Sequence, residues 1–514
     1  MGAAKRLESA VSNDRLRQLL GPASALLHPL YGLLLLLFAC LPLLAIASQP
    51  LGIVLAAFST YLLLMAVRLE QPWLQLTPLP PLTVVCLGAW IHSGIGGGII
   101  AISTPSPGSA VAMGMWKHLP EAQLLWIIFC ALNVLTFLLR PPANAPAPRS
   151  EQQINSKALI RLTIACSIVA LGSIAIGFIS GTLDRNPSSY LYWVSQRWRP
   201  DSVLTMFARF RDVYFFLAPL AIFKARSNWR KALLLAIFLA YIAMALPLGG
   251  RGLLLWPFVY SCMGLWLTPI APKNLRTALL ATAACCIFML PLIQAYKVQL
   301  ISADHDRTSI PGRLEALQKA ASNLNPFSSG TTSQLYPLGS SMYGCIDALL
   351  FQPPASTRPR AGFHRMENIL TAWIPELLVH KSSPLRDAHL IAAEASGLTR
   401  QEAESKTYTS HDCVTFGADL YWRGSWTAVA LGSAAAAIFY RLISELWYRH
   451  CGWQSVQQIL LLVYPATFIT VYPFGSVGET AWLWMWDLPK YIILISLICL
   501  IADRLANNQQ HTGK

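Results

Sequence analysis

Charged residues are scarce in this sequence. They make up 12% of its 514 positions, whereas 54% of the positions are hydrophobic, and the mean hydropathy is +0.47. Soluble proteins carry about 25% charged residues, so this composition excludes a cytosolic enzyme. The apolar residues fall in about a dozen stretches of roughly 15 to 22 residues, each long enough to cross a ~30 Å hydrocarbon layer as a helix. The composition therefore predicts a polytopic membrane protein.

Several chemical signatures are absent as well. The sequence has no phosphate-cradling glycine loop, no internal repeat, no Cys-x-x-Cys pair and no His-Glu-x-x-His metal pattern. These absences argue against nucleotide-driven pumps, and we expect no metal and no cofactor. Most of the 11 cysteines lie in apolar stretches, which excludes a disulfide scaffold. Cys345 and Cys413 lie in a polar segment, and for this pair a disulfide bond and two free thiols both remain open.

The apolar stretches predict an all-α bundle of about twelve transmembrane helices, with one large outward loop between the ninth and tenth spans. We expect spans near residues 26–47, 51–67, 82–102, 124–139, 158–179, 205–223, 232–247, 253–270, 279–296, 425–440, 456–472 and 485–502. The expected order is a cytoplasmic segment 1–25, nine spans within 26–296, an outer segment 297–424, three spans within 425–502 and a cytoplasmic tail 503–514.

Lysine and arginine are concentrated in every second short loop, and short basic loops stay in the cytoplasm. The residues that set this pattern are Lys5, Arg6, Arg15, Arg17, Arg140, Arg149, Lys157, Lys224, Arg226, Arg230, Lys231, Lys273 and Arg276. Both termini are therefore predicted to be cytoplasmic. The formal net charge of +15 is best explained by these loops meeting anionic lipid, because the outer segment contains 12 basic and 12 acidic residues. Nucleic acid is not expected as a partner.

The outer segment holds five of the ten histidines, and so long a loop is usually functional. Before it, Arg251 stands in a tight outward turn, Gly249-Gly250-Arg251-Gly252. Its guanidinium could bind a diphosphate through paired hydrogen bonds. The alternative is an arginine that snorkels to the outer headgroups.

Two further groups of residues could carry chemistry. Arg209 and Arg211 belong to an outward cluster of arginines and aromatic residues between 193 and 214, which could be a ligand-binding face or an interfacial aromatic belt. His411 opens a run in which Asp419 and Arg423 form an i,i+4 pair on a predicted helix. His411 or a partly buried Asp419 could remove a proton near neutral pH, although a histidine near a membrane surface is also often a simple polar group.

These residues make the chain similar to the O-antigen and exopolysaccharide (oligosaccharide repeat unit) polymerase family, which is related to O-antigen ligase. The resemblance covers roughly residues 200–440. Three pieces carry it: the turn 249–252, the stretch from Trp373 to Pro384, and the run from Phe416 to Gly424. They resemble the family's small-residue-arginine-glycine turn, its Ile-Pro-Arg…Lys-Pro pattern and its Gly-Glu-x-Tyr…Gly entry into a late span. Glu376 stands where arginine is usual, and Asp419 replaces the usual glutamate.

The resemblance implies glycosyl transfer at the outer leaflet of a bacterial inner membrane. The donor would be a polyprenyl-diphosphate-linked oligosaccharide, and the acceptor a sugar hydroxyl of another lipid-linked repeat unit. A chain-length regulator and a flippase would be partners, besides membrane lipid. The expected substrate-binding residues are Arg251, Arg209, Arg211, Lys381 and Arg423, and the candidate bases are Asp419 and His411.

Three other functions remain open. A ligase would transfer the glycan to a lipid or protein acceptor. A transporter or flippase would use the same number of spans, but it should show two similar halves with midplane polar residues, and we see neither. A non-catalytic assembly subunit would keep the fold without needing the arginines.

The orientation can be tested by cysteine labelling in intact cells. We expect Gly330→Cys, in the outer segment, to react with a membrane-impermeant maleimide, and Asn228→Cys, in a basic loop, to react only after permeabilisation. Labelling at 228 but not at 330 would overturn the topology.

Overall fold

The computed structural model describes residues 29–74, 80–105, 110–142, 156–180, 210–245, 310–322, 347–364, 385–395, 397–405, 414–450 and 476–482, together with some isolated positions. Within these residues the protein is mostly helical and contains no strand, as expected for an all-α protein. The chain divides into two compact units. Unit 1 comprises Met1–Ala145, Pro326–Cys451 and Ala466–Leu488, and unit 2 comprises Pro146–Asn325, Gly452–Pro465 and Pro489–Lys514. The expected outer segment 297–424 therefore contributes to both units.

Helices occupy eight of the twelve expected spans, and the other four (253–270, 279–296, 456–472 and 485–502) lie almost entirely outside the described residues. Among the described residues, four helical stretches are long and apolar enough to cross a membrane: Pro50–Leu69, Pro81–Ile102, Leu119–Leu139 and Phe416–Glu445. Large apolar side chains are exposed on several helices, for example Phe38, Leu139 and Leu431. Such surfaces suit contact with lipid. The protein thus has the character of a membrane protein, and the count of twelve spans stays a prediction.

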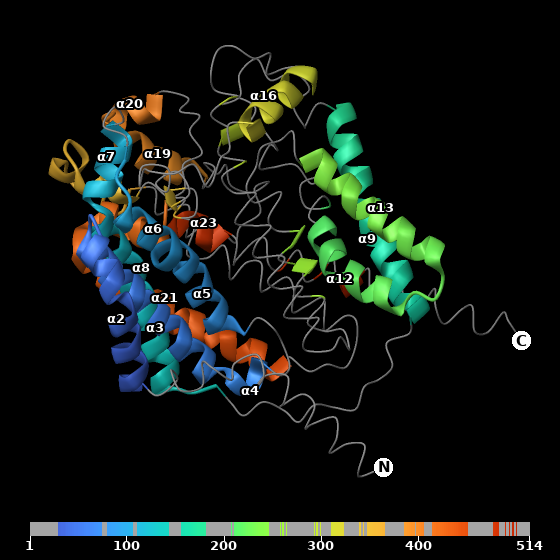
Figure 1. Ribbon diagram of the computed structural model, residues 1–514, viewed down its shortest axis with the longest axis horizontal. Coiled ribbons are helices and arrows are strands. Elements are labelled where there is room, and N and C mark those ends of the chain that lie inside the picture. The colour runs from blue at the N-terminus through green and yellow to red at the C-terminus, as the bar shows by residue number, and fades with distance from the viewer. Residues whose placement is uncertain are drawn as a thin grey trace, which may run out of the picture. The chain divides into compact units, whose positions relative to one another are not determined.

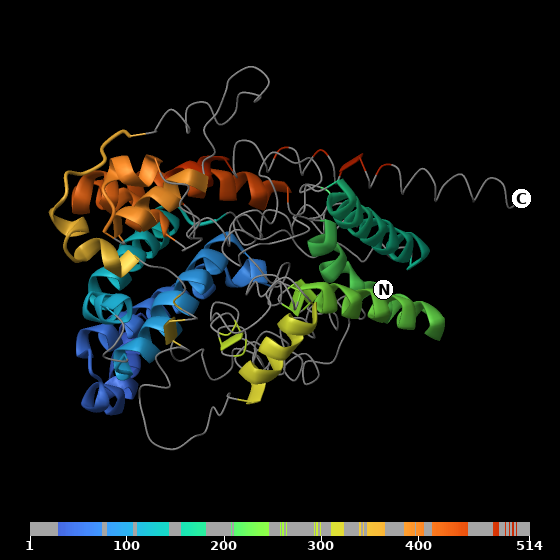
Figure 2. The same cartoon turned by 90° about the horizontal axis from the view of Figure 1, so that it is seen from above.

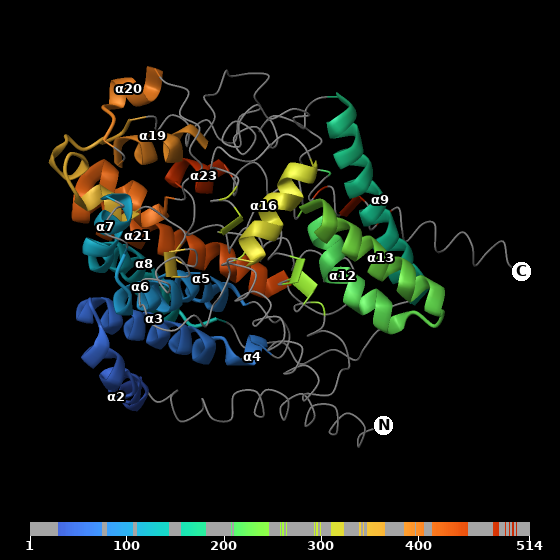
Figure 3. The ribbon, with the colours of Figure 1, turned by 45° about the horizontal axis from the view of Figure 1, so that its top comes forward.

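The membrane-length helices of unit 1 pack as a bundle around α8 (Figures 1 and 3). Its helices are α2 (Pro29–Ile46), α3 (Pro50–Leu69), α4 (Gln71–Leu74), α5 (Pro81–Ala89), the π-helix η3 (Trp90–Gly96), α6 (Gly97–Ile102), α7 (Ala110–Lys117), α8 (Leu119–Leu139) and α21 (Phe416–His450). More than half of the most apolar window of α8 is buried, because α3, α5 and α21 all contact it. Figure 2 shows the long α21 of this unit in orange.

Small residues allow these helices to approach closely. The buried amide of Gln123 in α8 donates to the carbonyl oxygens of Gly52 (3.1 Å) and Ser93 (2.8 Å). A Cβ on Gly97 would overlap Gln123 Nε2, and one on Gly52 would lie 2.9 Å from Ala101 Cβ. Glycine is therefore required where α3, α6 and α8 meet, as is common where helices pack in membranes.

The bundle has two opposite ends. At one end, which we call the Gln49 end, Gln49 N–H donates to Ala101 O at 3.0 Å. At the other, the Glu70 end, Glu70 accepts hydrogen bonds from the backbone of Leu82 (2.9 Å) and Thr83 (2.6 Å) and from the Tyr448 hydroxyl. α3, α8 and α21 end at the Glu70 end, whereas the stretch from α5 to α6 runs the opposite way. The Glu70 end carries Arg68, Arg140 and Arg441, so the charge pattern predicts that it faces the cytoplasm.

Part of the outer segment packs on unit 1. Its elements are the 3₁₀-helices η6 (Asp347–Phe351) and η7 (Ala355–Thr357), then α19 (Leu385–Ala395) and α20 (Arg400–Ser405), and α23 (Val477–Trp482) joins them. η6 contacts α7, α8 and α21. The backbone oxygen of Tyr343 bonds His92 Nδ1 in η3, and a Cβ on Gly339 would lie 2.9 Å from Ile100 N. This part of the outer segment is thus an integral part of unit 1.

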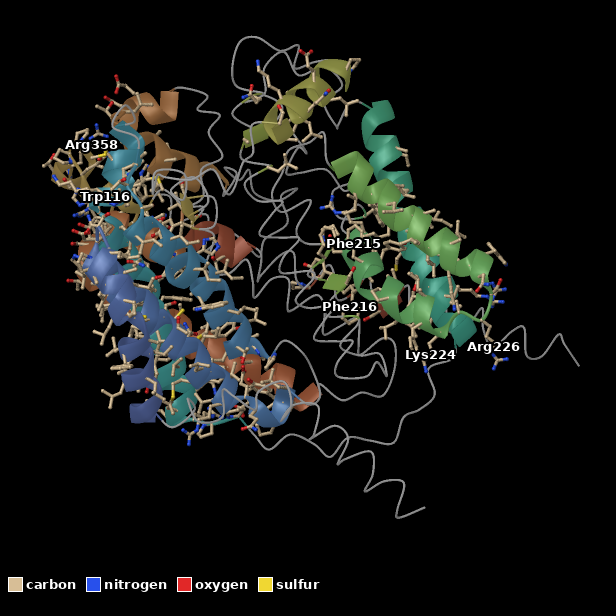
Figure 4. All side chains as sticks on the ribbon, in the orientation of Figure 1. Trp116, Phe215, Phe216, Lys224, Arg226 and Arg358 are labelled. Carbon is tan, nitrogen blue, oxygen red and sulfur yellow. The ribbon has the colours of Figure 1, made fainter. Side chains whose placement is uncertain are left out.

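Unit 2 contains α9 (Ser156–Ser180), α12 (Phe210–Lys224), α13 (Asn228–Ala245) and α16 (Ile310–Ser322). Aromatic rings join α12 to α13: Phe215 lies 5.3 Å from both Phe238 and Tyr241, centroid to centroid. The Tyr241 hydroxyl donates to Ser167 O in α9 at 3.1 Å. Lys224 and Arg226 lie at the turn between α12 and α13 (Figure 4), in a loop that the charge pattern assigns to the cytoplasm.

The close packing around Gly97 in unit 1 can be tested by a pair of glycine-to-alanine variants. Gly97→Ala should lower the unfolding temperature in detergent or nanodiscs, because the new methyl group displaces the Gln123 amide, and a buried donor left without a partner costs about 1–3 kcal/mol. Gly172→Ala in α9 is the control, since its Cβ would meet nothing within 4 Å. Equal unfolding temperatures of the two variants would contradict this packing.

Candidate functional site

Two of the predicted site residues, Asp419 and Arg423, lie at the start of α21, where the run from Phe416 to Gly424 forms the first turns of the helix. Thr415 caps this helix: its hydroxyl accepts a hydrogen bond from Ala418 N–H at 3.1 Å, as an N-cap threonine does. Phe416 packs against Phe129 of α8, with ring centroids 5.6 Å apart. A Cβ on Gly417 would lie 3.0 Å from Leu125 Cβ, so glycine lets the helix start lie close to α8.

Asp419 and Arg423 form the predicted i,i+4 ion pair, with 2.8 Å between Arg423 Nε and Asp419 Oδ1. The Asp419 side chain is fully buried, and that of Arg423 is 6% exposed. Asp419 Oδ2 accepts a hydrogen bond from the backbone N–H of Val477 at 2.7 Å. Both carboxylate oxygens therefore have partners, and Asp419 joins α21 to α23.

Arg423 carries the connection to the outer segment. Its Nη1 donates to the backbone oxygen of His364 at 2.6 Å and lies 3.5 Å from that of Gly362. In the reverse direction, Gly362 N–H donates to Arg423 O at 2.9 Å, and Ala361 N–H donates to Trp422 O at 3.1 Å. The turn 361–364, in which Gly362 has a φ of +57°, is thereby fixed against the helix.

A second buried carboxylate, Asp347, lies at the same helix start. Asp347 Oδ1 accepts a hydrogen bond from Thr415 N–H at 3.0 Å, and its side chain is fully buried. Burial raises the pKa of Asp347 to about 7, although its hydrogen bonds with Thr415 oppose the shift. Asp347 was not among the residues predicted from the sequence, because 68 positions separate it from Thr415 and no local motif contains it.

A network around Glu394 holds α19 and α20 on the same helix start. Glu394 Oε2 accepts a hydrogen bond from Trp422 Nε1 at 2.7 Å, and Glu394 Oε1 pairs with Arg400 Nε at 2.7 Å. Arg358 donates to the carbonyl oxygens of Glu394, Gly397 and Leu398, the last ones of α19 and the turn after it. Arg358 and Trp116 lie at the same end of unit 1 (Figure 4).

The remaining predicted site residues are only partly described. Arg211 belongs to unit 2, where its Nε pairs with Asp212 Oδ1 at 3.3 Å. Arg209, Arg251, Lys381 and His411 lie outside the described residues, as do Cys345 and Cys413. The structure therefore brings Asp419 and Arg423 together, and the expected approach of Asp419 or His411 to Arg251 stays a prediction. No group of three or more potential metal ligands occurs among the described residues.

Asp347 predicts a pH dependence of stability. Its pKa in the folded protein lies above the ordinary value of 3.8, so the folded state gains from its protonation. This stabilisation is fully present below about pH 4 and is lost as the pH rises through about 7. Asp347→Asn should therefore reduce the fall in unfolding temperature between pH 4.5 and pH 8.

Some pH dependence should remain in Asp347→Asn, because burial also raises the pKa of Glu70 to about 7. Glu315→Gln removes an exposed carboxylate and should retain the wild-type profile. If Asp347→Asn and wild type have parallel profiles, Asp347 does not titrate in this range.

A scan against protein-family models, a comparison with curated proteins and a comparison with solved structures each gave no match to this chain. The family resemblance accordingly rests on the three sequence motifs, of which the described residues include the third.

Proposed function

We propose that this protein is a membrane polysaccharide polymerase. It transfers glycan from a polyprenyl-diphosphate-linked oligosaccharide to a sugar hydroxyl of another lipid-linked repeat unit, at the outer leaflet of a bacterial inner membrane. The observation that carries the proposal is the entry of α21. Its motif run, Phe416 to Gly424, leads into a membrane-length helix and is bonded through Arg423 to the outer segment. This arrangement supports a reaction at the boundary between membrane and outer segment.

The reaction needs an electrostatic site for its leaving group. The bond between the donor sugar and the diphosphate breaks, a bond from that sugar to the acceptor oxygen forms, and the hydroxyl proton passes to a base. Negative charge then develops on the diphosphate, where arginine donors stabilise it. In this proposal Arg251 binds the diphosphate, with Arg209, Arg211 and Lys381 in support.

The predicted base is either His411 or Asp419. The Asp419 side chain is fully buried, and its two oxygens already bond Arg423 and the backbone of Val477, so the protein holds it in place away from an acceptor hydroxyl at the surface. Its contacts support a positioning role, in which Asp419 holds Arg423 and the turn 361–364 in place. His411 is then the proposed base, since a neutral imidazole can accept a proton near pH 7.

The function can be tested in cells and with the purified protein. Cells lacking the protein should accumulate single lipid-linked repeat units and lose long glycans. Purified protein in nanodiscs should lengthen lipid-linked units without a nucleotide sugar. Arg251→Ala should abolish lengthening, and Arg251→Lys should restore only part of it, because an ammonium lacks the paired donors of a guanidinium. The control is Arg226→Ala, which removes an exposed arginine from a loop predicted to be cytoplasmic.

Other outcomes would identify the other functions. Normal glycan lengths that are no longer attached to their final acceptor would indicate a ligase. Repeat units trapped on the inner leaflet would indicate a flippase. If cells lacking the protein lose long glycans but Arg251→Ala and wild type support the same yield at equal protein level, the protein acts as an assembly subunit and the proposed chemistry is wrong.

A further inference from the structure

Four side chains from two segments gather where α21 bends, and we call them the kink cluster: Phe351, Arg360, Tyr421 and Trp426. The ring centroid of Phe351 lies 4.4 Å from that of Tyr421 and 5.7 Å from that of Trp426. The Tyr421 and Trp426 centroids are 5.3 Å apart, with their planes at 65°. Tyr421 is buried, whereas Phe351, Arg360 and Trp426 are half-buried and reach the surface.

The kink places Trp426 in this cluster. Residues five apart on a regular helix point in different directions, because each residue turns the helix by about 100°. Gly424 (φ −151°, ψ 25°) and Ser425 (φ 62°, ψ −159°) interrupt α21, and the interruption brings Trp426 against Tyr421. A serine in this glycine-type conformation costs on the order of 1–3 kcal/mol, and such strain is concentrated at functional sites.

Arg360 differs from the other arginines described at this end of unit 1. Arg358 and Arg423 donate to backbone oxygens, and Arg400 pairs with Glu394. Among the described residues, Arg360 has a single hydrogen bond, from Nη2 to the Tyr421 hydroxyl at 3.2 Å. Its guanidinium carbon lies 4.4 Å from the centre of the Tyr421 ring, which fixes its plane. The remaining N–H donors of Arg360 are thus oriented but available.

We propose that the kink cluster is a carbohydrate-binding subsite that takes a sugar ring of the lipid-linked glycan. The apolar face of a sugar ring stacks on the half-buried Phe351 and Trp426, and Arg360 donates paired hydrogen bonds to neighbouring ring oxygens or to an acidic substituent. An aromatic belt at a membrane interface exposes its rings to the lipid headgroups. Tyr421 is instead buried, with the guanidinium of Arg360 over its ring. The subsite rests on the proposed function and extends it, because it lies beside the Asp419–Arg423 pair and involves none of the residues assigned to the diphosphate.

The subsite is tested by binding, separately from catalysis. The probe is the oligosaccharide released by mild acid from the lipid-linked glycans of cells lacking this protein, titrated by calorimetry into the full-length protein in nanodiscs. Arg360→Gln and Trp426→Leu should each weaken binding at least tenfold, about 1.4 kcal/mol. In the lengthening assay, both variants should raise the KM for lipid-linked units with little change in kcat.

The matched control is Arg230→Gln, because Arg230 likewise lies over an aromatic ring, 5.8 Å from the centre of Trp229, in α13. This variant should bind as wild type does. If Arg360→Gln lowers the unfolding temperature, Phe351→Leu tests the same subsite with the arginine in place.

Two kinds of failure are distinguishable. If wild type binds the oligosaccharide and the kink-cluster variants bind equally well, the subsite is wrong while the proposed function stands. If cells lacking the protein make glycans of normal length, the proposed function fails, and with it the subsite.

Discussion

The buried ion pair between Asp419 and Arg423 is the contact on which order at the start of α21 depends. It connects three separate parts of the chain, because Asp419 also bonds Val477 and Arg423 also bonds His364. Two charges at this depth are costly to desolvate, and only their mutual pairing with additional hydrogen bonds makes the arrangement tolerable. Loss of one partner would leave a buried charge, at a cost of about 3–5 kcal/mol. The position of the turn 361–364, and with it Arg360, follows from this pair.

The same physical constraint explains the ends of the other helices. A helix leaves N–H groups at its start and carbonyl oxygens at its end without partners, and water is scarce inside a membrane protein. Glu70 accepts from the first N–H groups of α5, and Arg441 donates to the carbonyl oxygens of Arg140 (2.8 Å) and Pro141 (3.0 Å) just after α8. Arg358 does the same for α19. Charged residues in this chain thus satisfy backbone groups that a soluble protein would leave to water.

Local patterns in the sequence predicted the features that depend on local physics. Apolar runs located helices at the eight expected spans that the structure describes, and four-residue spacing predicted the Asp419–Arg423 pair, which the structure confirms. Features made by distant residues could not be predicted. Tyr448 bonds Glu70 across 378 positions, and Asp347 meets Thr415 across 68. The helix that contains the expected span 425–440 also extends beyond it to His450, where hydropathy gives no signal because Arg441 and Tyr448 are held by long-range hydrogen bonds at the Glu70 end.

The arginines show most clearly why residue type alone does not identify a site. The sequence predicts Arg423 as a substrate-binding residue, and in the structure it is buried and bound to Asp419 and to the backbone oxygen of His364. An arginine that binds a ligand keeps some N–H donors that the protein's own acceptors do not occupy. How many it keeps depends on the folded structure and cannot be predicted from the residue type. The plane of Arg360 is fixed by Tyr421, and within the described part of the chain most of its N–H groups donate to no protein acceptor, unlike those of an arginine buried among carbonyl oxygens. The strained bend at Ser425 brings Trp426 against the same Tyr421 ring, and in the proposed subsite the cost of this bend is offset by a preorganised binding surface.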